Sequence, residues 1–145
     1  MKIFAENKRA LFDYEVLEKY EAGVKLHGFE VKAVKTGHID LTGSYATIRN
    51  GEVFLLNAFI PPYQAKNTPA SYEPKRTRKL LLKSSEIKAL IGKSKGLTMI
   101  PIRVYTKDRG KLKIEFALAR ARKKYDKREL IKKREAMREM RGVKF

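Results

Sequence analysis

Two runs near the end of the chain alternate between apolar and other residues at every second position, and a short segment joins them. The first covers 100–106 and the second 112–118. A period of two places successive side chains on opposite faces of a strand, so both runs predict half-buried strands with one hydrated face. Residues 107–110 predict the turn between them, and Pro101 predicts a strand start or a sheet edge. This hairpin commits much of the chain to antiparallel β-structure.

A second hairpin signal lies earlier, where Asn50-Gly51 separates the apolar-rich runs 45–49 and 52–56. Asn and Gly both tolerate positive φ, which a two-residue hairpin turn requires. Such a turn fixes the register and sets two opposite charges across from each other, which supports it. The predicted pairs are Arg49 with Glu52, Ile48 with Val53 and Thr47 with Phe54.

The stretch 12–26 is ambiguous, because Leu17 interrupts the alternation between two apolar runs. A bulged or bent strand pair accounts for the interruption, and we prefer it. A helix with apolar residues spaced over 12–20 is the alternative. Further on, a loop punctuated by prolines at 61–75 precedes a predicted strand at 76–82.

Two short helices complete the predicted body. Residues 29–35 predict a helix that ends at Gly37, and residues 84–91 predict one that begins at a Ser84 cap and stops at Gly92. At least five strands with two short helices favour a small closed β-barrel over βαβ units. The predicted fold class is therefore mainly β.

The last 26 residues are more basic than the rest, with 12 Lys and Arg against four Asp and Glu. They carry almost too little apolar surface for a core, so we expect a polyanion to order them. Asp126 and Glu129 stand in a capping-box relation that predicts a helix over roughly 127–141, with Gly142 as its stop. A helix of about 15 residues is marginal alone in water, so we predict a tail that is disordered when free and helical when bound.

The charge of the whole chain points to a polyphosphate partner. The net charge is +18 and the isoelectric point is near 10.1, and the body is basic as well as the tail. A cationic protein of the membrane surface is the competing class, but the apolar stripe of the tail is too narrow for it, and no apolar run is long enough to span a bilayer. The lack of cysteine and of an apolar signal segment after Met1 leads us to expect a reducing cytoplasm.

An enzyme is disfavoured, because the chemistry-bearing residues form no known constellation. His27 and His38 are the two histidines, and neither has a metal-ligand spacing. The sequence contains no phosphate-binding loop, nucleophile elbow or zinc-protease motif. The aspartates fall near predicted turns and helix caps, which those residues favour. We therefore expect a binding module with no cofactor and no metal.

Several basic and aromatic residues are candidates for contacts to RNA. Arg76, Arg78 and Lys79 form either a ridge that contacts phosphates or an ordinary solvated strand face. The Asn7-Lys8-Arg9 segment adds an amide that can hydrogen-bond a base or a sugar. Tyr125 lies in a run of charge and is either a base-stacking residue or an exposed tyrosine without a role.

Five segments, in order along the chain, form a set that is specific as a whole although each segment is weak alone. The segments are Asn7-Lys-Arg-Ala10, Tyr20-Glu-Ala-Gly23, Gly28-Phe-Glu-Val-Lys32, Arg76-Thr-Arg-Lys-Leu-Leu-Leu82 and Lys123-Lys-Tyr-Asp-Lys-Arg128. The ordered set spans essentially the whole chain, and together it resembles the SmpB (small protein B) family. Members of that family are the protein partners of transfer-messenger RNA (tmRNA) in bacterial trans-translation.

The resemblance implies an OB-fold-like closed β-barrel with short flanking helices, as residues 1–122, and a basic tail, as residues 123–145. The body would bind the tRNA-like domain of tmRNA and deliver it to the A site of a stalled ribosome for peptide tagging and rescue. The tail would reach the decoding centre and the empty mRNA channel of the small subunit. Through tmRNA, elongation factor Tu and alanyl-tRNA synthetase would be indirect partners. No membrane is implied.

The family's RNA-binding positions can be placed on this chain. Glu21 would contact RNA or orient a neighbouring cation, and we leave both open. Leu81 would pack on a nucleotide, with burial as its alternative, and Glu30 would serve structure. The positions implied for tmRNA are Asn7, Lys8, Arg9, Glu21, Lys32, Arg76, Arg78, Lys79 and Leu81.

The tail positions are implied in the same way. Tyr125 fills a position that is often histidine in the family. Either ring can stack on a ribosomal base, but tyrosine cannot take the role of a protonated histidine. Arg122 stands where the family usually has glycine, which puts in doubt the same hinge flexibility between body and tail. The positions implied for the ribosome are Lys123, Lys124, Tyr125, Asp126, Lys127, Arg128, Lys132, Lys133 and Arg134. The rival function is a general RNA-binding or ribosomal protein with a basic extension.

Overall fold

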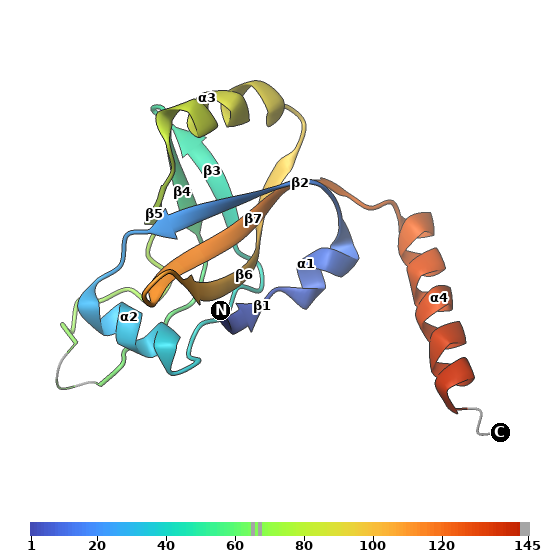
Figure 1. Ribbon diagram of the computed structural model, residues 1–145, viewed down its shortest axis with the longest axis horizontal. Helices are drawn as coiled ribbons and strands as arrows, with labels where there is room; N and C mark the ends of the chain where they lie inside the picture. Colours follow the sequence, from blue (N-terminus) through green and yellow to red (C-terminus); the bar gives the residue numbers. More distant parts are fainter. Residues whose placement is uncertain (65, 67, 143–145) are drawn as a thin grey trace.

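Seven antiparallel strands build the body in a computed structural model, which describes residues 1–142 apart from 65 and 67, and no side chains at 124–126 and 140–142. The strand order is β1-β6-β3-β4-β5-β2-β7, with an additional pairing of β6 with β7 (Figure 1). The strands are β1 (Lys2–Glu6), β2 (Tyr14–Val24), β3 (Tyr45–Arg49), β4 (Glu52–Leu56), β5 (Arg78–Leu81), β6 (Thr98–Lys107) and β7 (Lys111–Ala121).

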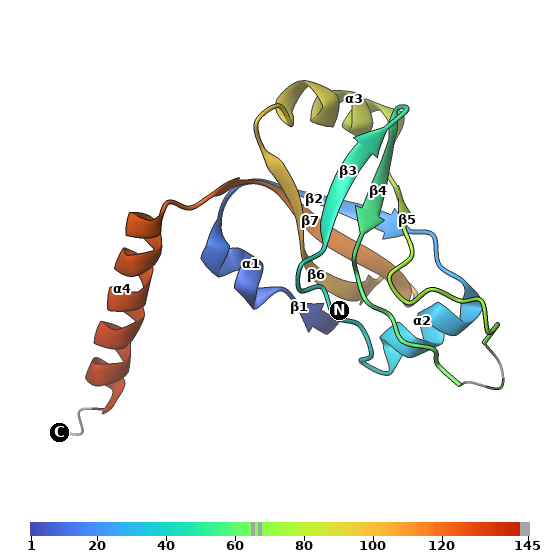
Figure 2. The same cartoon turned by 180° about the vertical axis from the view of Figure 1, so that it is seen from behind.

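Four helices are described around and beyond this sheet. Helix α3 lies at one end of the strands and α2 near the other, while α1 lies beside β1 (Figures 1 and 2). Helix α4 follows β7 and extends away from the body on the side of α1. The helices are α1 (Lys8–Asp13), α2 (Gly28–Lys35), α3 (Ser84–Lys93) and α4 (Lys124–Gly142).

The pairing of β6 with β7 joins the two sides of the sheet into a ring of hydrogen-bonded strands. Two joints of the ring are short. Strands β3 and β6 meet at the single pair Ala46 and Met99, whereas β2 and β5 meet at Gly23 with Leu81 and Val24 with Leu80. The predicted mainly β class is confirmed, and the closed OB-type barrel remains our interpretation of the ring.

Both predicted hairpins are present. Strands β3 and β4 pair in the predicted register, with Arg49 opposite Glu52. The turn holds Asn50 at φ 51° and Gly51 at φ 73°, the left-handed region that these two residues tolerate. Strands β6 and β7 form the second hairpin, and Lys107 pairs with Lys111 across its turn.

Pro101 lies inside β6 rather than at a strand start or a sheet edge, so that prediction was wrong. On the edge of β6 away from β7, Met99 pairs with β3 and Arg103 pairs with Glu6 of β1. Pro101 falls between these two partners, where its missing N–H breaks no ladder. The β6–β7 register also shifts between Pro101 and Arg103, which is a site where strands accept proline.

The ambiguous stretch divides into a helix and one long strand. The β2–β7 register shifts between Val16 and Glu18, so the predicted bulge at Leu17 is confirmed. At the start of the stretch, Phe12 and Asp13 lie in α1 instead of a first strand. Asn7 starts this helix, because its side chain accepts a hydrogen bond from the Ala10 backbone N–H at 3.2 Å.

The helix boundaries required corrections at α3 and α4. Ser84 is the first residue of α3 rather than its cap, and Glu86 accepts from the Lys83 N–H at 3.1 Å. Gly92 lies within α3 rather than after it. Helix α4 begins at Lys124, so Asp126 lies inside it and not at its cap. The predicted stop at Gly142 borders 143–145, which lie outside the described residues.

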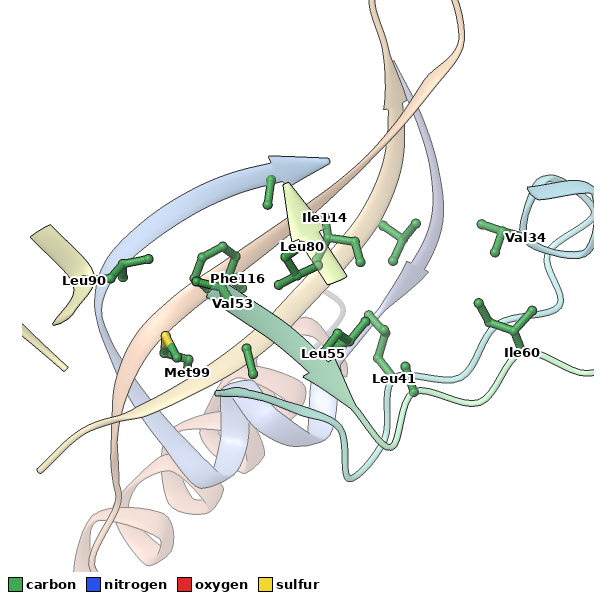
Figure 3. Packing of buried hydrophobic residues seen from close by; sticks show 14 of the residues in the cluster. Val34, Leu41, Val53, Leu55, Ile60, Leu80, Leu90, Met99, Ile114 and Phe116 are labelled. Atoms are coloured by element: carbon green, nitrogen blue, oxygen red, sulfur yellow. The ribbon is translucent and has the colours of Figure 1, made fainter. Parts of the chain in front are cut away.

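The main core lies between the strands of the ring (Figure 3). Val53, Leu55, Leu80, Ile114 and Phe116 are each at most 1% exposed, and they come from β4, β5 and β7. A smaller cluster packs α1 on β6 and β7 through Ala10, Ile100, Ile102, Ala117 and Ala119. These two clusters fix the positions of the short strands and of α1.

Candidate nucleic-acid interface

An open groove of about 700 Å³ is lined by residues of β2, β5 and the start of α3. It brings together Glu21, Lys79 and Leu81, three of the residues predicted to bind RNA. The period of two in β5 explains their placement, because Arg78 and Leu80 are buried at 1% exposure while Lys79 and Leu81 face outward. The other charged residues that line the groove are Glu52, Lys83, Glu86 and Lys113, so the lining holds three lysines and three glutamates.

Leu81 is 50% exposed, so burial, the alternative to a nucleotide contact, is wrong. The Leu81 side chain lies against Gly23, close enough that a Cβ added to Gly23 would be 3.4 Å from the Leu81 Cβ. Leu81 also lines a second hollow of about 460 Å³ with apolar residues of β2, α2 and β7. An exposed leucine between two hollows is suited to pack against the face of a base.

Glu21 is held by two residues of β6. The Tyr105 hydroxyl donates a hydrogen bond to Glu21 Oε2, and Lys107 Nζ lies 3.4 Å from Oε1. The hydrogen bond from Tyr105 lowers the pKa of Glu21 most, against burial, and the charges of Lys107 and Lys113 add to it. Because Glu21 lines the groove, it can contact RNA, and because it lies close to Lys107, it can orient that cation. The structure is therefore compatible with both predictions for Glu21.

Glu30 is a buried acceptor that joins α2 to the segment before β5. Its side chain is fully buried and accepts from the His27 N–H at 2.8 Å and from Arg78 Nε at 2.7 Å. Arg76 also binds it through Nε, 3.2 Å from both carboxylate oxygens. Burial alone would raise the pKa of Glu30, but the bonds from Arg76 and His27 and the charge of Arg78 lower it to about 2. The structural role expected for Glu30 is confirmed.

Arg78 cannot contact phosphate in this structure, so that prediction was wrong. Its side chain is completely buried. Besides Glu30, its remaining N–H groups meet the carbonyls of Ala58, Arg76 and Pro74 and the Tyr72 hydroxyl, at 2.8 to 3.2 Å. A guanidinium has five N–H donors, and here all five have partners inside the protein. Arg76 is 26% exposed and also serves this cluster.

Asn7 is likewise unavailable to RNA, which corrects the prediction of a direct contact. The residue is 4% exposed. Its Nδ2 donates to the carbonyls of Leu41 at 3.2 Å and Pro101 at 3.0 Å, while its oxygen caps α1. Asn7 therefore ties the start of α1 to β6 and to the chain before β3.

The other predicted tmRNA residues are exposed but lie apart from the groove. Lys8 and Arg9 lie on α1, on the α4 side of the body, and Lys32 lies on α2 (Figure 1). Arg9 is 69% exposed and binds Asp13 at 3.0 Å. The structure therefore distributes these cations over several faces instead of gathering them in one site.

The first half of α4 is anchored on α1. Lys127 Nζ lies 3.2 Å from Asp13 Oδ1, and the Arg122 N–H donates to the Asp13 carbonyl at 2.9 Å. The Arg134 guanidinium lies 5.3 Å from the centre of the Phe12 ring, within range of a cation–π contact. Burial would raise the pKa of Asp13, but its bonds from Lys127 and Arg9 lower it. Two of the predicted ribosome-binding cations thus have partners in the body.

The remaining predicted tail residues are placed in part. Arg128, Lys132 and Lys133 are exposed on α4, and Lys132 lies 3.9 Å from Glu129. Lys123 lies between β7 and α4. The side chains of Lys124, Tyr125 and Asp126 lie outside the described residues, so the stacking predicted for Tyr125 remains a prediction.

Sequence reasoning missed several residues of these sites. Tyr105 reads as one member of an alternating strand, and no local signal marks it as the partner of Glu21. Asp13 was counted among the aspartates near predicted turns and caps, although its position four residues after Arg9 on a helix predicts their ion pair. Tyr72, which binds Arg78, lies in an irregular loop where sequence patterns carry little information about contacts.

Across the described parts of the chain, no helix combines the length and apolarity needed to cross a bilayer. Within the same residues, no group of three or more metal-ligating side chains is assembled.

Comparisons with known proteins identify relatives over nearly the whole chain. The family model described as "SmpB protein" matches residues 4–144. An "SsrA-binding protein" of Thermosipho africanus (strain TCF52B) is 51% identical over 142 residues, covering 97% of this chain and 95% of the relative. Another, of Trichodesmium erythraeum (strain IMS101), is 49% identical over 141 residues, covering 96% and 90%. A chain of a solved structure described as "tmRNA-SmpB: a journey to the center of the bacterial ribosome" is 44% identical with a TM-score of 0.68, covering 86% of this chain and 87% of that one.

Proposed function

This chain belongs to the SmpB family, and we propose that it binds the tRNA-like domain of tmRNA and delivers it to the A site of stalled ribosomes for trans-translation. Its relatives are described as binding SsrA, the RNA also called tmRNA, and a similar chain belongs to a structure described by tmRNA, SmpB and the ribosome. Its role is that of an adaptor that positions RNA, while the ribosome supplies the chemistry. Elongation factor Tu and alanyl-tRNA synthetase act on the same tmRNA, and the complex works in the cytoplasm.

The groove that unites Glu21, Lys79 and Leu81 is the observation that carries the RNA-binding part of this proposal. Lys79 and Leu81 share the outer face of β5 because they are two residues apart, and Glu21 joins them from β2, although no spacing in the sequence requires that meeting. The groove offers a lysine for phosphate, a carboxylate for ribose hydroxyls or base amines, and an exposed leucine for a base face. Non-specific attraction of RNA by charge would need only the lysine. The presence of a carboxylate and an exposed leucine beside it therefore favours a site that recognises the shape and chemistry of an RNA.

The basic helix α4 carries the second part of the proposal. It stands away from the body and presents Arg128, Lys132 and Lys133 along an exposed surface. A cationic helix of this kind fits a channel lined by RNA phosphates, such as the empty mRNA channel of the small subunit. We propose residues 1–122 as the tmRNA-binding body and 123–145 as the segment directed to the decoding centre.

Removal of residues 123–145 tests this division. We expect the truncated protein to bind the tRNA-like domain with near-normal affinity and to support no peptide tagging in a reconstituted trans-translation reaction, because body and tail have separate partners. The matched control replaces 123–145 with a flexible neutral linker of equal length. Normal tagging by the truncated protein would refute the role of the tail.

A general RNA-binding protein with a basic extension is the alternative function. The scatter of Lys8, Arg9 and Lys32 over several faces favours it, because dispersed cations attract any polyanion. It predicts similar affinity for any structured RNA of equal length.

A further inference from the structure

Tyr105 does not line the groove, but it contacts Glu21, which does. The residue is 4% exposed, on β6, and pairs with Lys113 of β7, which in turn pairs with Gly23 of β2. Glu21 is two residues before Gly23 and on the same face of β2. The Tyr105 side chain therefore reaches diagonally across β7, and its hydroxyl donates to Glu21 Oε2.

The three carboxylates of the groove have different partners. Glu52 forms an ion pair with Lys79 at 2.9 Å, and Glu86 caps α3 by accepting from the Lys83 N–H. Glu21 instead accepts from a neutral phenol, with Lys107 at the longer distance of 3.4 Å. A neutral donor orients a carboxylate without neutralising it, and an ionised carboxylate has about four lone-pair sites. Glu21 therefore keeps its charge and accepting capacity for a ligand.

The charges around Glu21 favour its ionised form on balance. Lys107 of β6 and Lys113 of β7 lower its pKa together with the stronger effect of Tyr105. Glu115 of β7 lies directly across from Glu21 as a like charge, but it is paired with Lys19 at 3.8 Å and Arg103 at 3.4 Å.

We propose, on the basis of the function proposed above, that Tyr105 is a positioning residue for RNA recognition, which holds the Glu21 carboxylate toward the groove so that it accepts from ribose hydroxyls or base amines. A fixed negative charge in the groove repels phosphate and favours a hydrogen-bond donor as its ligand. Tyr105 and Glu21 therefore contribute to selectivity among RNAs more than to general attraction.

Tyr105→Phe tests this proposal, because it removes one hydroxyl and keeps the buried ring. Without the hydroxyl, ordering the Glu21 side chain becomes a cost of RNA binding, which for a flexible side chain corresponds to a loss of roughly twofold to tenfold in affinity. We expect that loss for a transcript of the tRNA-like domain and a smaller one for an unrelated stem-loop of equal length. The salt dependence of binding should stay unchanged, because no phosphate contact is lost.

Two further variants separate a positioning role from a structural one. Tyr20→Phe is the matched control, since the Tyr20 hydroxyl donates to Glu18 at 2.6 Å on the same strand but outside the groove, and its affinity should equal that of the unchanged protein. In a Glu21→Ala background, Tyr105→Phe should have no further effect. An equal loss in both backgrounds, or no loss at all, would overturn the proposal.

The carboxyl titration of Glu21, followed by NMR on the full-length protein without RNA, gives a readout that general loosening of the fold would not produce. Tyr105→Phe should raise the pKa of Glu21 toward its ordinary value, and an unchanged titration would contradict the proposed contact. If the unchanged protein fails to prefer the tRNA-like domain, the proposed function fails, and this role of Tyr105 fails with it. If the preference holds and Tyr105→Phe changes nothing, only this inference fails.

Discussion

Replacing Glu30 with glutamine should lower the free energy of unfolding at neutral pH, and it should lower it much less in acid. The carboxylate is fully buried between Arg76 and Arg78, which hold its pKa at about 2 against an ordinary value of 4.5. Each unit of pKa corresponds to 1.36 kcal/mol, so ionised Glu30 contributes about 3 kcal/mol to the free energy of unfolding. Its loss also leaves the buried Arg78 charge without a counter-ion, and we expect Glu30→Gln to cost about 3–5 kcal/mol at pH 7.

The pH dependence gives this prediction its sign. Because the folded pKa is lowered, the contribution of Glu30 is complete above about pH 4.5 and is lost as the pH falls toward 2. By pH 3 about three fifths of it is gone, so the variant and the unchanged protein should differ by about 2 kcal/mol less at pH 3 than at pH 7.

Urea unfolding at both pH values measures the difference. Glu15→Gln is the control, because Glu15 forms an exposed ion pair with Arg120 at 3.0 Å and should matter by less than about 1 kcal/mol. An equal difference between Glu30→Gln and the unchanged protein at pH 7 and pH 3 would refute the assignment of a low pKa to Glu30.

Three more predictions concern the groove, the backbone and the tail. Lys79→Ala should lower the salt slope of RNA binding by about 1, as expected for one lost phosphate contact. Arg78→Met should leave the slope unchanged, because the Arg78 side chain is buried. Equal slopes for Lys79→Ala and the unchanged protein would show that Lys79 makes no phosphate contact. In urea unfolding, Gly51→Ala should lower the free energy of unfolding by about 1–2 kcal/mol, because Gly51 has φ 73°. Gly92→Ala, within α3 and with open space around it, should raise the free energy of unfolding by up to about 1 kcal/mol. A reversal of these signs would contradict the described turn and helix. Asp13→Asn should weaken the contact of α4 with α1 and speed amide exchange in the first turns of α4, and unchanged exchange would show that Lys127 and Asp13 do not hold the tail.

The hairpins could be predicted because their signals are local. Asn50-Gly51 needs positive φ, and the alternation along β7 identifies its buried face without knowledge of the partner strands. The bulge at Leu17 was readable for the same reason, as a break in a period of two. Phe12 and Asp13 were misread as strand, because the cap at Asn7 that starts α1 was not recognised.

The buried polar residues could not be placed from the sequence. The run Leu80-Leu81-Leu82 is apolar on both faces, so it does not reveal that Arg78 faces inward and Leu81 outward. The partners of Arg78 lie in α2, in the loop before β5 and just after β4, and only the folded chain brings these segments together. The pairing of Glu21 with Tyr105 across 84 residues is invisible for the same reason.

The affinity of the purified protein for the tRNA-like domain of tmRNA, compared with an unrelated stem-loop of equal length at two salt concentrations, tests the central claim most directly. We predict much tighter binding to the tRNA-like domain, and a preference that persists at the higher salt, because the groove contributes contacts other than charge. Equal binding of both RNAs that collapses as salt is raised would show that the net charge alone drives binding, and it would contradict the proposed function.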